Sequence, residues 1–363
     1  MVTTGTHDPL DGLDPQSGLR RRFRAAPSGG SDTLVVVQSQ ARVVPPRFGL
    51  ERLFATTRHA CLFLDCPDSA WYLGCEAATD AAIDAALAVA APSRIIHYGA
   101  SKGAYGALAT ALRRRDGAAY AFGPEFELGL PGTHSGLYRA PGQPGEPDLV
   151  RALAETRTPH PLTLVFGLHD PVDAAGFARL ARIPRPPAVR LLALRSPHAS
   201  HDHLYTLNIV RKLIARFDRD LAGLCDERGL ISPEGAGTAD AFATAGHRLA
   251  TGDPPDPDAL ARDLVPALNP GHGLLLAECL LAAGRAAEAA GVLREAITLT
   301  ESAKGLAAQP KRWRKQFWRE LILALARAGD ASGAGETARE ALARFPNDAD
   351  IATLADRVAG RDA

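Results

Sequence analysis

The residues best suited to chemistry lie in a glycine-flanked turn, Gly99-Ala100-Ser101-Lys102-Gly103, which directly follows the apolar run 95–98. A serine hydroxyl becomes a nucleophile when a neighbouring imidazole removes its proton. A sharp strand-to-helix turn needs small neighbours, and Gly99, Gly103 and Gly106 supply them. The pattern predicts a nucleophile elbow with Ser101 at its tip, facing the first amides of the following helix. The alternative for Ser101 is an ordinary helix N-cap.

An acid and a group of histidines follow later strands of the predicted sheet. Asp170 comes directly after the apolar run 162–166, with Asp173 as the alternative acid. The segment after the run 189–194 contains His198, His201 and His203, of which we favour His201 as the base and keep His198 as the next candidate. Ligands and catalytic groups of open α/β sheets gather at the carboxyl ends of the strands. Ser101, Asp170 and His201 are therefore expected to form a triad.

The elements that must position these residues alternate between strands and helices. Strands are predicted at 34–37, 60–65, 94–98, 118–122, 162–166 and 189–194, and helices at 76–90, 103–115, 174–181 and 203–224. A segment rich in Pro and Gly, 123–148, interrupts the alternation. The expected fold class is α/β, with a mostly parallel sheet covered by helices on both faces.

The carboxyl-terminal third shows no strand pattern. Helical pairs are predicted at 273–285 with 286–299, and at 318–329 with 331–345. Their small residues and Gly-Arg or Gly-Asp turns resemble tetratricopeptide (TPR)-like helical hairpins. Stacked hairpins often bind a protein segment, and the basic, tryptophan-containing stretch 311–318 suggests an acidic partner. The alternative is a helical buttress that covers the first domain.

Residues 34–224, with the G-x-S-x-G turn and the chain order serine, acid, histidine, resemble the α/β-hydrolase superfamily. The G-x-S-K-G form is also similar to hydrolase-like proteins that acetylate glycans in bacterial accessory secretion systems. The resemblance implies Ser101 as nucleophile, Asp170 as acid and a histidine of the last cluster as base. It also implies oxyanion donors at the Lys102 amide and around Gln38, Ser39 and Gln40, although this loop lacks the H-G-G-G form of many esterases.

Other polar side chains have simpler interpretations. The Lys102 side chain is expected to extend into solvent, where it can attract an anionic substrate group. His97 and His169 are interpreted as structural. A metal site formed by His198, His201 and His203 is the lesser alternative, since imidazoles are common zinc and iron ligands.

Composition limits the partners. The chain has 363 residues, with 41 basic and 41 acidic side chains, so nothing favours nucleic acid or a membrane surface. Five scattered cysteines fit neither a disulfide framework nor a zinc cage, and are expected to be buried thiols. No apolar segment is long enough to span a bilayer. We expect a soluble, cytoplasmic protein that needs no cofactor.

The sequence predicts a flexible segment 1–30, an α/β-hydrolase-like domain 31–230 and a helical domain 236–363. The predicted function is a serine esterase or acyltransferase acting on a small-molecule or glycan ester, leaving open whether water or a sugar hydroxyl accepts the acyl group. The alternative is a catalytically silent scaffold whose helical repeats bind a protein partner.

Overall fold

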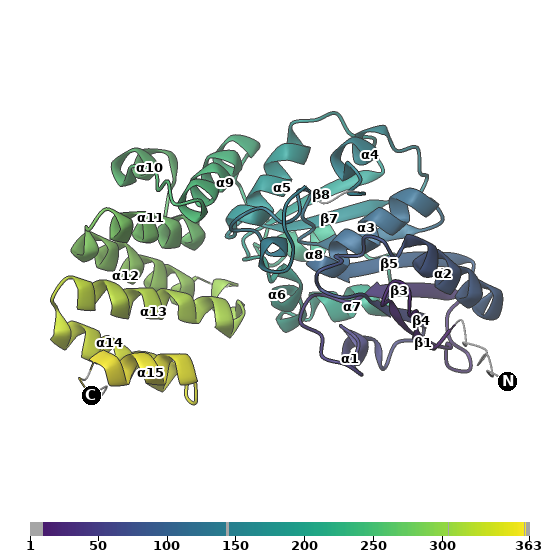
Figure 1. The fold of residues 1–363 in the computed structure, drawn as a ribbon, viewed down its shortest axis with the longest axis horizontal. Coiled ribbons are helices and arrows are strands. Elements are labelled where there is room, and N and C mark those ends of the chain that lie inside the picture. The colour runs from purple at the N-terminus through teal and green to yellow at the C-terminus, as the bar shows by residue number, and fades with distance from the viewer. Residues whose placement is uncertain (1–9, 143–144, 304, 359, 361–363) are drawn as a thin grey trace. The chain divides into compact units, whose positions relative to one another are not determined.

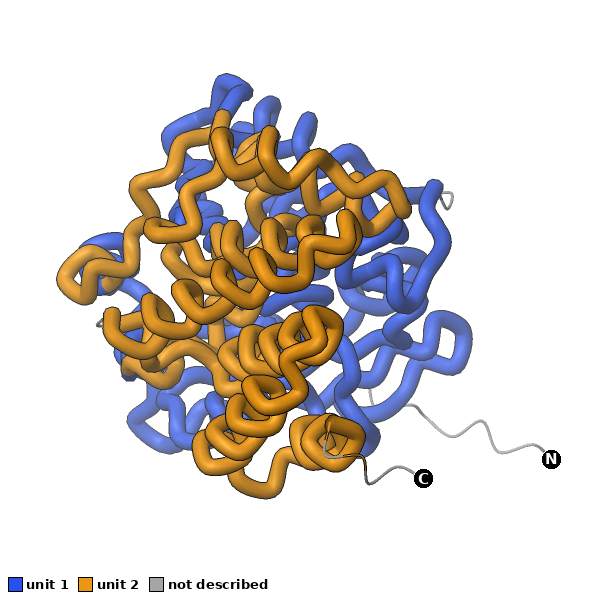
Figure 2. Tube along the Cα trace, turned by 90° about the vertical axis from the view of Figure 1, so that its left-hand side faces the viewer, with its two compact units in different colours: residues 1–166, 179–193, 208–224 blue, residues 167–178, 194–207, 225–363 orange. Residues whose placement is uncertain are grey.

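The computed structural model describes residues 10–142, 145–303, 305–358 and 360 (Figure 1). The chain divides into two compact units, shown in Figure 2. Unit 1 comprises residues 1–166, 179–193 and 208–224, and unit 2 comprises residues 167–178, 194–207 and 225–363.

A sheet of eight strands forms the centre of the α/β region, in the order β1-β2-β4-β3-β5-β6-β7-β8. Its strands are β1 (Gly12–Leu13), β2 (Arg20–Arg24), β3 (Thr33–Gln38), β4 (Ala60–Asp65), β5 (Arg94–Ala100), β6 (Ala118–Phe122), β7 (Leu162–Gly167) and β8 (Val189–Leu194). The pairs β4–β3, β3–β5, β5–β6 and β6–β7 are parallel, while β1–β2 and β2–β4 are antiparallel. Every residue of β3, β4 and β7 is buried, as expected for interior strands covered on both faces. The predicted α/β fold class is confirmed.

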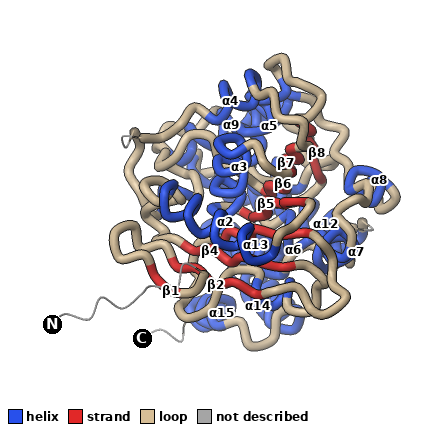
Figure 3. Tube along the Cα trace, turned by 90° about the vertical axis from the view of Figure 1, so that its right-hand side faces the viewer, coloured by secondary structure: helices blue, strands red, loops and turns tan. Residues whose placement is uncertain are grey.

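Helices of unit 1 cover the sheet on both faces; they are α1 (Glu51–Phe54), α2 (Glu76–Ala90), α3 (Lys102–Arg114), α4 (Leu149–Glu155) and α7 (Ile209–Ala215). The chain also forms α5 (Pro171–Ala181), α6 (Ser200–Thr206) and α8 (Leu221–Asp226). Successive strand residues point to opposite faces: Gly99 of β5 lies against the start of α3, whereas the Tyr98 ring makes edge-to-face contacts with Phe54 of α1 and with Phe217 beyond α7. Figure 3 shows α3 and α7 on opposite sides of the strands.

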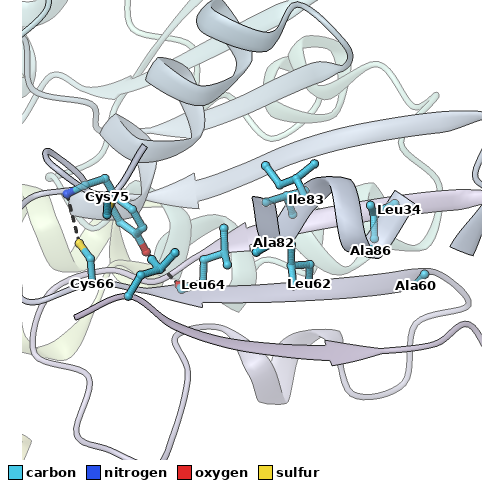
Figure 4. Packing of buried hydrophobic residues seen from close by; sticks show 12 residues of the cluster. Leu34, Ala60, Leu62, Leu64, Cys66, Cys75, Ala82, Ile83 and Ala86 are labelled. Carbon is cyan, nitrogen blue, oxygen red and sulfur yellow. Dashed lines mark hydrogen bonds between the residues drawn. The ribbon is translucent and has the colours of Figure 1, made fainter. Parts of the chain in front are cut away.

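One apolar cluster fixes α2 to the sheet. Ala82, Ile83 and Ala86 of α2 pack over Leu34 of β3 and Leu62 of β4, all nearly or fully inaccessible to solvent (Figure 4). The cluster also contains two of the five cysteines; all five are buried thiols that form no disulfide, as expected from the sequence.

The amino-terminal segment differs from expectation. Within the stretch expected to be flexible, β1 and β2 add to the sheet edge, and residues 1–9 lie outside the described residues. Strand β2 has the sequence RRRFR, which lacks apolar alternation. Its arginines find acidic partners instead: Arg20 pairs with Asp65, and Arg22 with Glu51 at 2.7 Å.

The long helix predicted over 203–224 is wrong. The chain forms α6, α7 and α8 there, because Asn208 adopts a left-handed conformation at φ 63° and Arg216 is extended. Asparagine is one of the few residue types that tolerate this left-handed conformation.

The carboxyl-terminal region is helical throughout its described residues. Its helices are α9 (Ala236–Ala250), α10 (Pro257–Asp263), α11 (Pro270–Ala282), α12 (Ala286–Ser302), α13 (Lys311–Arg327), α14 (Ala331–Arg344) and α15 (Ala349–Val358). Antiparallel neighbours follow one another from α11 to α14, consistent with the predicted hairpins. Among the described residues, every helix is too short or too polar to traverse a bilayer.

Candidate active site

The turn between β5 and α3 has the geometry of a nucleophile elbow. Ser101 adopts φ 54° and ψ −123°, a backbone conformation that non-glycine residues rarely hold. Its amide donates to Phe122 O at 2.8 Å, which fixes the turn to β6. A Cβ on Gly99 would lie 2.0 Å from Gly103 O, and a Cβ on Gly103 would lie 2.1 Å from Gln38 O. Glycine is therefore required at both positions.

Several of the groups expected to donate to an oxyanion already have hydrogen-bond acceptors inside the protein. Within α3, the amides of Ala104 and Tyr105 donate to Ser101 O. In the loop after β3, the Ser39 amide donates to Leu64 O at 2.9 Å, and the Gln38 side chain donates inward to Thr110 Oγ1 at 3.1 Å. The Gln38 side chain and the Ser39 amide therefore already donate to acceptors inside the protein. Gln40 is the candidate oxyanion donor that remains in this loop.

The Lys102 side chain does not extend into solvent, contrary to expectation. It is fully buried, and its Nζ donates to Cys66 O at 2.7 Å and to Asp68 at 2.8 Å, with Asp65 at 3.3 Å. Burial by itself lowers the pKa of Lys102, but the Cys66 thiol and the two carboxylates outweigh burial, so that the pKa is raised. Lys102 therefore acts as a buried cation that holds the start of α3 to Asp65 and Asp68, and it is not available to bind an anionic substrate group.

Asp68 extends this anchor to the loop after β3. Its second carboxylate oxygen accepts from the Arg42 amide at 2.9 Å. The Lys102 side chain therefore connects the elbow, through Asp68, with the segment that contains Gln40.

In unit 2, the structure pairs His198 with Asp173. His198 Nδ1 lies 2.7 Å from Asp173 Oδ1, and Asp173 Oδ2 accepts from the Gly167 amide at 2.7 Å. Asp173 is almost completely buried. Burial raises the pKa of its carboxyl, while the adjacent His198 acts to lower it. Because the carboxylate accepts at Nδ1, the lone pair of the neutral imidazole lies on Nε2.

Asp170 and His201, the acid and base favoured from the sequence, make other contacts. Asp170 Oδ1 accepts from the amides of Val172 at 2.9 Å and Asp173 at 3.2 Å, which is the helix-capping role considered as its alternative. His201 lies in the first turn of α6, with Nδ1 3.8 Å from Asp202. The choice between the two histidines depends on loop geometry, for which the sequence carries no signal beyond their shared cluster.

His203 is not suited to be a metal ligand in the predicted cluster of His198, His201 and His203. Both ring nitrogens of His203 are engaged, Nδ1 with Ser196 Oγ at 3.1 Å and Nε2 with Gly305 O at 2.8 Å. Among the other histidines, His97 bonds Asp116 at 3.0 Å and His169 stacks on Trp313, consistent with structural roles.

The basic stretch of the helical region is engaged within its own unit. Trp313 and Trp318 are buried, Arg312 pairs with Asp202 at 3.1 Å, and Lys315 pairs with Asp348 at 2.9 Å. Arg314 donates to Gln309 O. These side chains stabilise the helical region itself.

Among solved structures, an alpha-beta serine hydrolase homologue from Coxiella burnetii is similar at 15% identity and a TM-score of 0.39, covering 57% of this chain and 95% of that chain. Est1E from Butyrivibrio proteoclasticus is similar at 14% identity and a TM-score of 0.36, covering 56% of this chain and 95% of that chain. No family model matches the chain, and no curated protein matches it. The α/β-hydrolase-like fold class stands on the sheet and the elbow described above.

Proposed function

We propose that this protein is a serine esterase or acyltransferase in which Ser101 is the nucleophile, His198 the general base and Asp173 the residue that orients His198. The observation that carries the proposal is the 2.7 Å hydrogen bond between His198 and the buried Asp173. It leaves the lone pair on Nε2, as an imidazole that takes a serine proton requires. The strained conformation of Ser101 and the chain order serine, acid, histidine support the same assignment.

In the proposed reaction, Ser101 Oγ attacks the carbonyl carbon of an ester while His198 Nε2 takes the hydroxyl proton. The carbonyl π electrons move onto oxygen, and the Lys102 amide at the start of α3 stabilises the resulting oxyanion, with Gln40 as the second donor. The intermediate collapses to an acyl-serine, and His198 gives its proton to the departing alcohol. Water or a sugar hydroxyl then attacks the acyl-serine while His198 takes its proton; the bond from the acyl carbon to Ser101 Oγ breaks, and His198 returns the proton to Ser101 Oγ. No step requires a cofactor.

The substrate class follows from this chemistry as a carboxylic ester of a small molecule or a glycan. Hydrolysis and transfer differ only in the acceptor, so both belong to the proposal. The proposal also includes a protein partner of the TPR-like helices. Such a partner would bind outside residues 312–318, whose basic side chains already contact other groups of the same unit.

The test is labelling of the purified protein with a fluorophosphonate probe. We expect labelling of the wild type, and its loss in Ser101→Ala and His198→Gln. His201→Gln is the matched control and should retain labelling, whereas Asp173→Asn should slow it by at least a hundredfold because His198 loses its orienting carboxylate. Labelling lost in His201→Gln but kept in His198→Gln would refute the assignment of the base.

A screen of aryl esters with and without sugar acceptors then separates the two outcomes for the acyl group. Acylated sugar in place of free acid indicates transfer. A folded wild type that is not labelled favours the scaffold alternative, in which the helical region binds a protein.

A further inference from the structure

The two segments that hold the acid and the base belong to the same compact unit as the carboxyl-terminal helices. Residues 167–178, here called the acid segment, and residues 194–207, here called the base segment, form unit 2 together with residues 225–363 (Figure 2). Within this unit the two segments are joined directly, since the Leu168 amide donates to Leu194 O and the His169 amide donates to Ser196 O, both at 2.9 Å.

The helical region holds the acid segment at its backbone. Asn269, at the start of α11, is buried; its Nδ2 donates to Leu168 O at 2.8 Å, and its Oδ1 accepts from the Gly271 amide. A Cβ on Gly271 would lie 2.4 Å from His169 O, so the helix start lies flush against this segment. The His169 ring stacks on Trp313 of α13 at 5.5 Å, with 22° between the ring planes.

A single buried amide connects the helical region with both segments. Gln309 Nε2 donates to His169 Nδ1 at 3.2 Å in the acid segment, and to Arg195 O at 3.1 Å in the base segment. Burial holds the pKa of His169 well below its ordinary value, so its imidazole is neutral and Nδ1 can accept. His169 precedes Asp173 by four residues, and Arg195 precedes His198 by three.

We propose that Gln309 is a positioning residue for the reaction: by binding both segments, it sets the register in which His198 meets Asp173. The helical region is thereby part of the catalytic apparatus instead of an appended binding module. The inference rests on the proposed function for its meaning in catalysis, while the positioning itself is a property of unit 2.

The experiment compares Gln309→Met and Gln309→Glu with the wild type. Methionine has a similar length but no donor, and a glutamate carboxylate accepts only, opposite two acceptors. Leu325→Ala is the matched control: it opens a cavity in α13, the helix that begins two residues after Gln309, about 18 Å along the axis from Trp313 at 1.5 Å per residue. The rate constant of fluorophosphonate labelling is measured per folded molecule from pH 5 to 9.

We expect Gln309→Met and Gln309→Glu to slow labelling by at least tenfold and to change its pH profile, because His198 no longer meets Asp173 in the native register. In Leu325→Ala the rate constant of labelling should stay within twofold of the wild-type value and its pH profile should not change. This holds even if Leu325→Ala lowers the melting temperature as much as the Gln309 variants do. A purely structural Gln309 would change the amount of folded protein and not these two quantities.

A second readout does not require activity. A hydrogen-bonded His198 Nδ1–H gives a low-field proton resonance, assigned by its disappearance in His198→Gln. The resonance should vanish or broaden in Gln309→Met and persist in Leu325→Ala. If the wild type is labelled and the Gln309 variants keep both the labelling rate and the resonance, the inference about Gln309 is wrong and the proposed function stands. An unlabelled wild type overturns the proposed function, and the resonance then still decides whether Gln309 positions the pair.

Discussion

At the scale of single residues, Ser101 holds a conformation that costs free energy. Backbone strain of this kind amounts to about 1–3 kcal/mol for a residue with a Cβ, and the φ of 54° is one that glycine adopts freely. Ser101→Gly should therefore be more stable than Ser101→Ala by about 1 kcal/mol, after the larger chain entropy of glycine in the unfolded state is subtracted. Urea unfolding of the two variants, which both lack the hydroxyl, measures the difference. Equal midpoints would mean that the elbow is not strained.

Lys102 is the second residue at which burial decides the outcome. Its replacement by methionine leaves Asp68 and the buried Asp65 without the ammonium, and we expect a loss of about 3 kcal/mol in the free energy of unfolding. Arg113→Met is the control, because the Arg113–Asp80 pair is about one third exposed on both sides and should contribute less than about 1 kcal/mol. Chemical denaturation of both variants tests this, and comparable losses would count against Lys102 as an anchor.

The sequence was sufficient to predict the strand-to-helix turn at Ser101, because its flanking glycines and the preceding strand are local features. It was not sufficient to predict that His198 pairs with Asp173. Asp170 and Asp173 lie within one turn of each other at the start of α5. The path of the backbone makes Asp170 the helix cap and places Asp173 in hydrogen-bond contact with His198. Lys102 was misjudged for the same reason, since its partners Asp65 and Asp68 are more than thirty residues away.

At the scale of elements, two glycines within helices have opposite roles. Gly103 lies where α3 passes the end of β3, and a Cβ there would stand 2.1 Å from a backbone oxygen that cannot move alone. Gly291 of α12 has open space around the same position. Gly103→Ala should destabilise by about 3 kcal/mol or more through overpacking, and Gly291→Ala should stabilise by up to about 1 kcal/mol through helix propensity.

Thermal unfolding of these two variants gives the comparison, and probe labelling adds a functional readout for Gly103→Ala. A fully stable Gly103→Ala would show that the elbow can move away from β3. A destabilised Gly291→Ala would mean that its surroundings are more crowded than the structure has them.

Strands and helices with clear apolar periodicity were predicted correctly, and those stabilised by polar contacts were missed. Strand β2 depends on Arg20 and Arg22 finding acidic partners along the chain. The break between α6 and α7 depends on one asparagine that can equally occupy a helix. Neither signal is visible in a pattern of apolar residues.

At the scale of the whole molecule, a single boundary near residue 230 does not describe how the chain is organised. The acid and base segments leave the sheet region and join the helical unit before the chain returns. The sequence order suggests two consecutive domains, whereas hydrogen bonds from Asn269 and Gln309 connect late residues with loops of the first. Long-range polar contacts of this kind leave no local trace in composition.

The stability of the helical unit should depend on pH through His272. Its ring is buried on α11, edge-on to Phe242 at 4.7 Å, and its Nδ1 accepts from the Val265 amide. Burial lowers the pKa of His272 from 6.5 to about 4. Between these values the unfolded chain binds the proton more readily than the folded one, so stability is present above about pH 6.5 and is lost as the pH falls towards 4. The difference amounts to about 3 kcal/mol at most.

His272→Gln removes this titration and keeps a hydrogen-bonding side chain. The variant should be less stable than the wild type at pH 7, where it loses packing, and the gap should close or reverse at pH 4. With Trp71 of unit 1 replaced by phenylalanine in every variant, fluorescence of Trp313 and Trp318, which are both buried in α13, follows unfolding of this unit in urea at each pH. His247→Gln, at an exposed position of α9, controls for the loss of one imidazole. A gap that stays constant from pH 7 to 4 would show that the folded helical unit accepts a charged imidazole at this position, and that another group sets its acid limit.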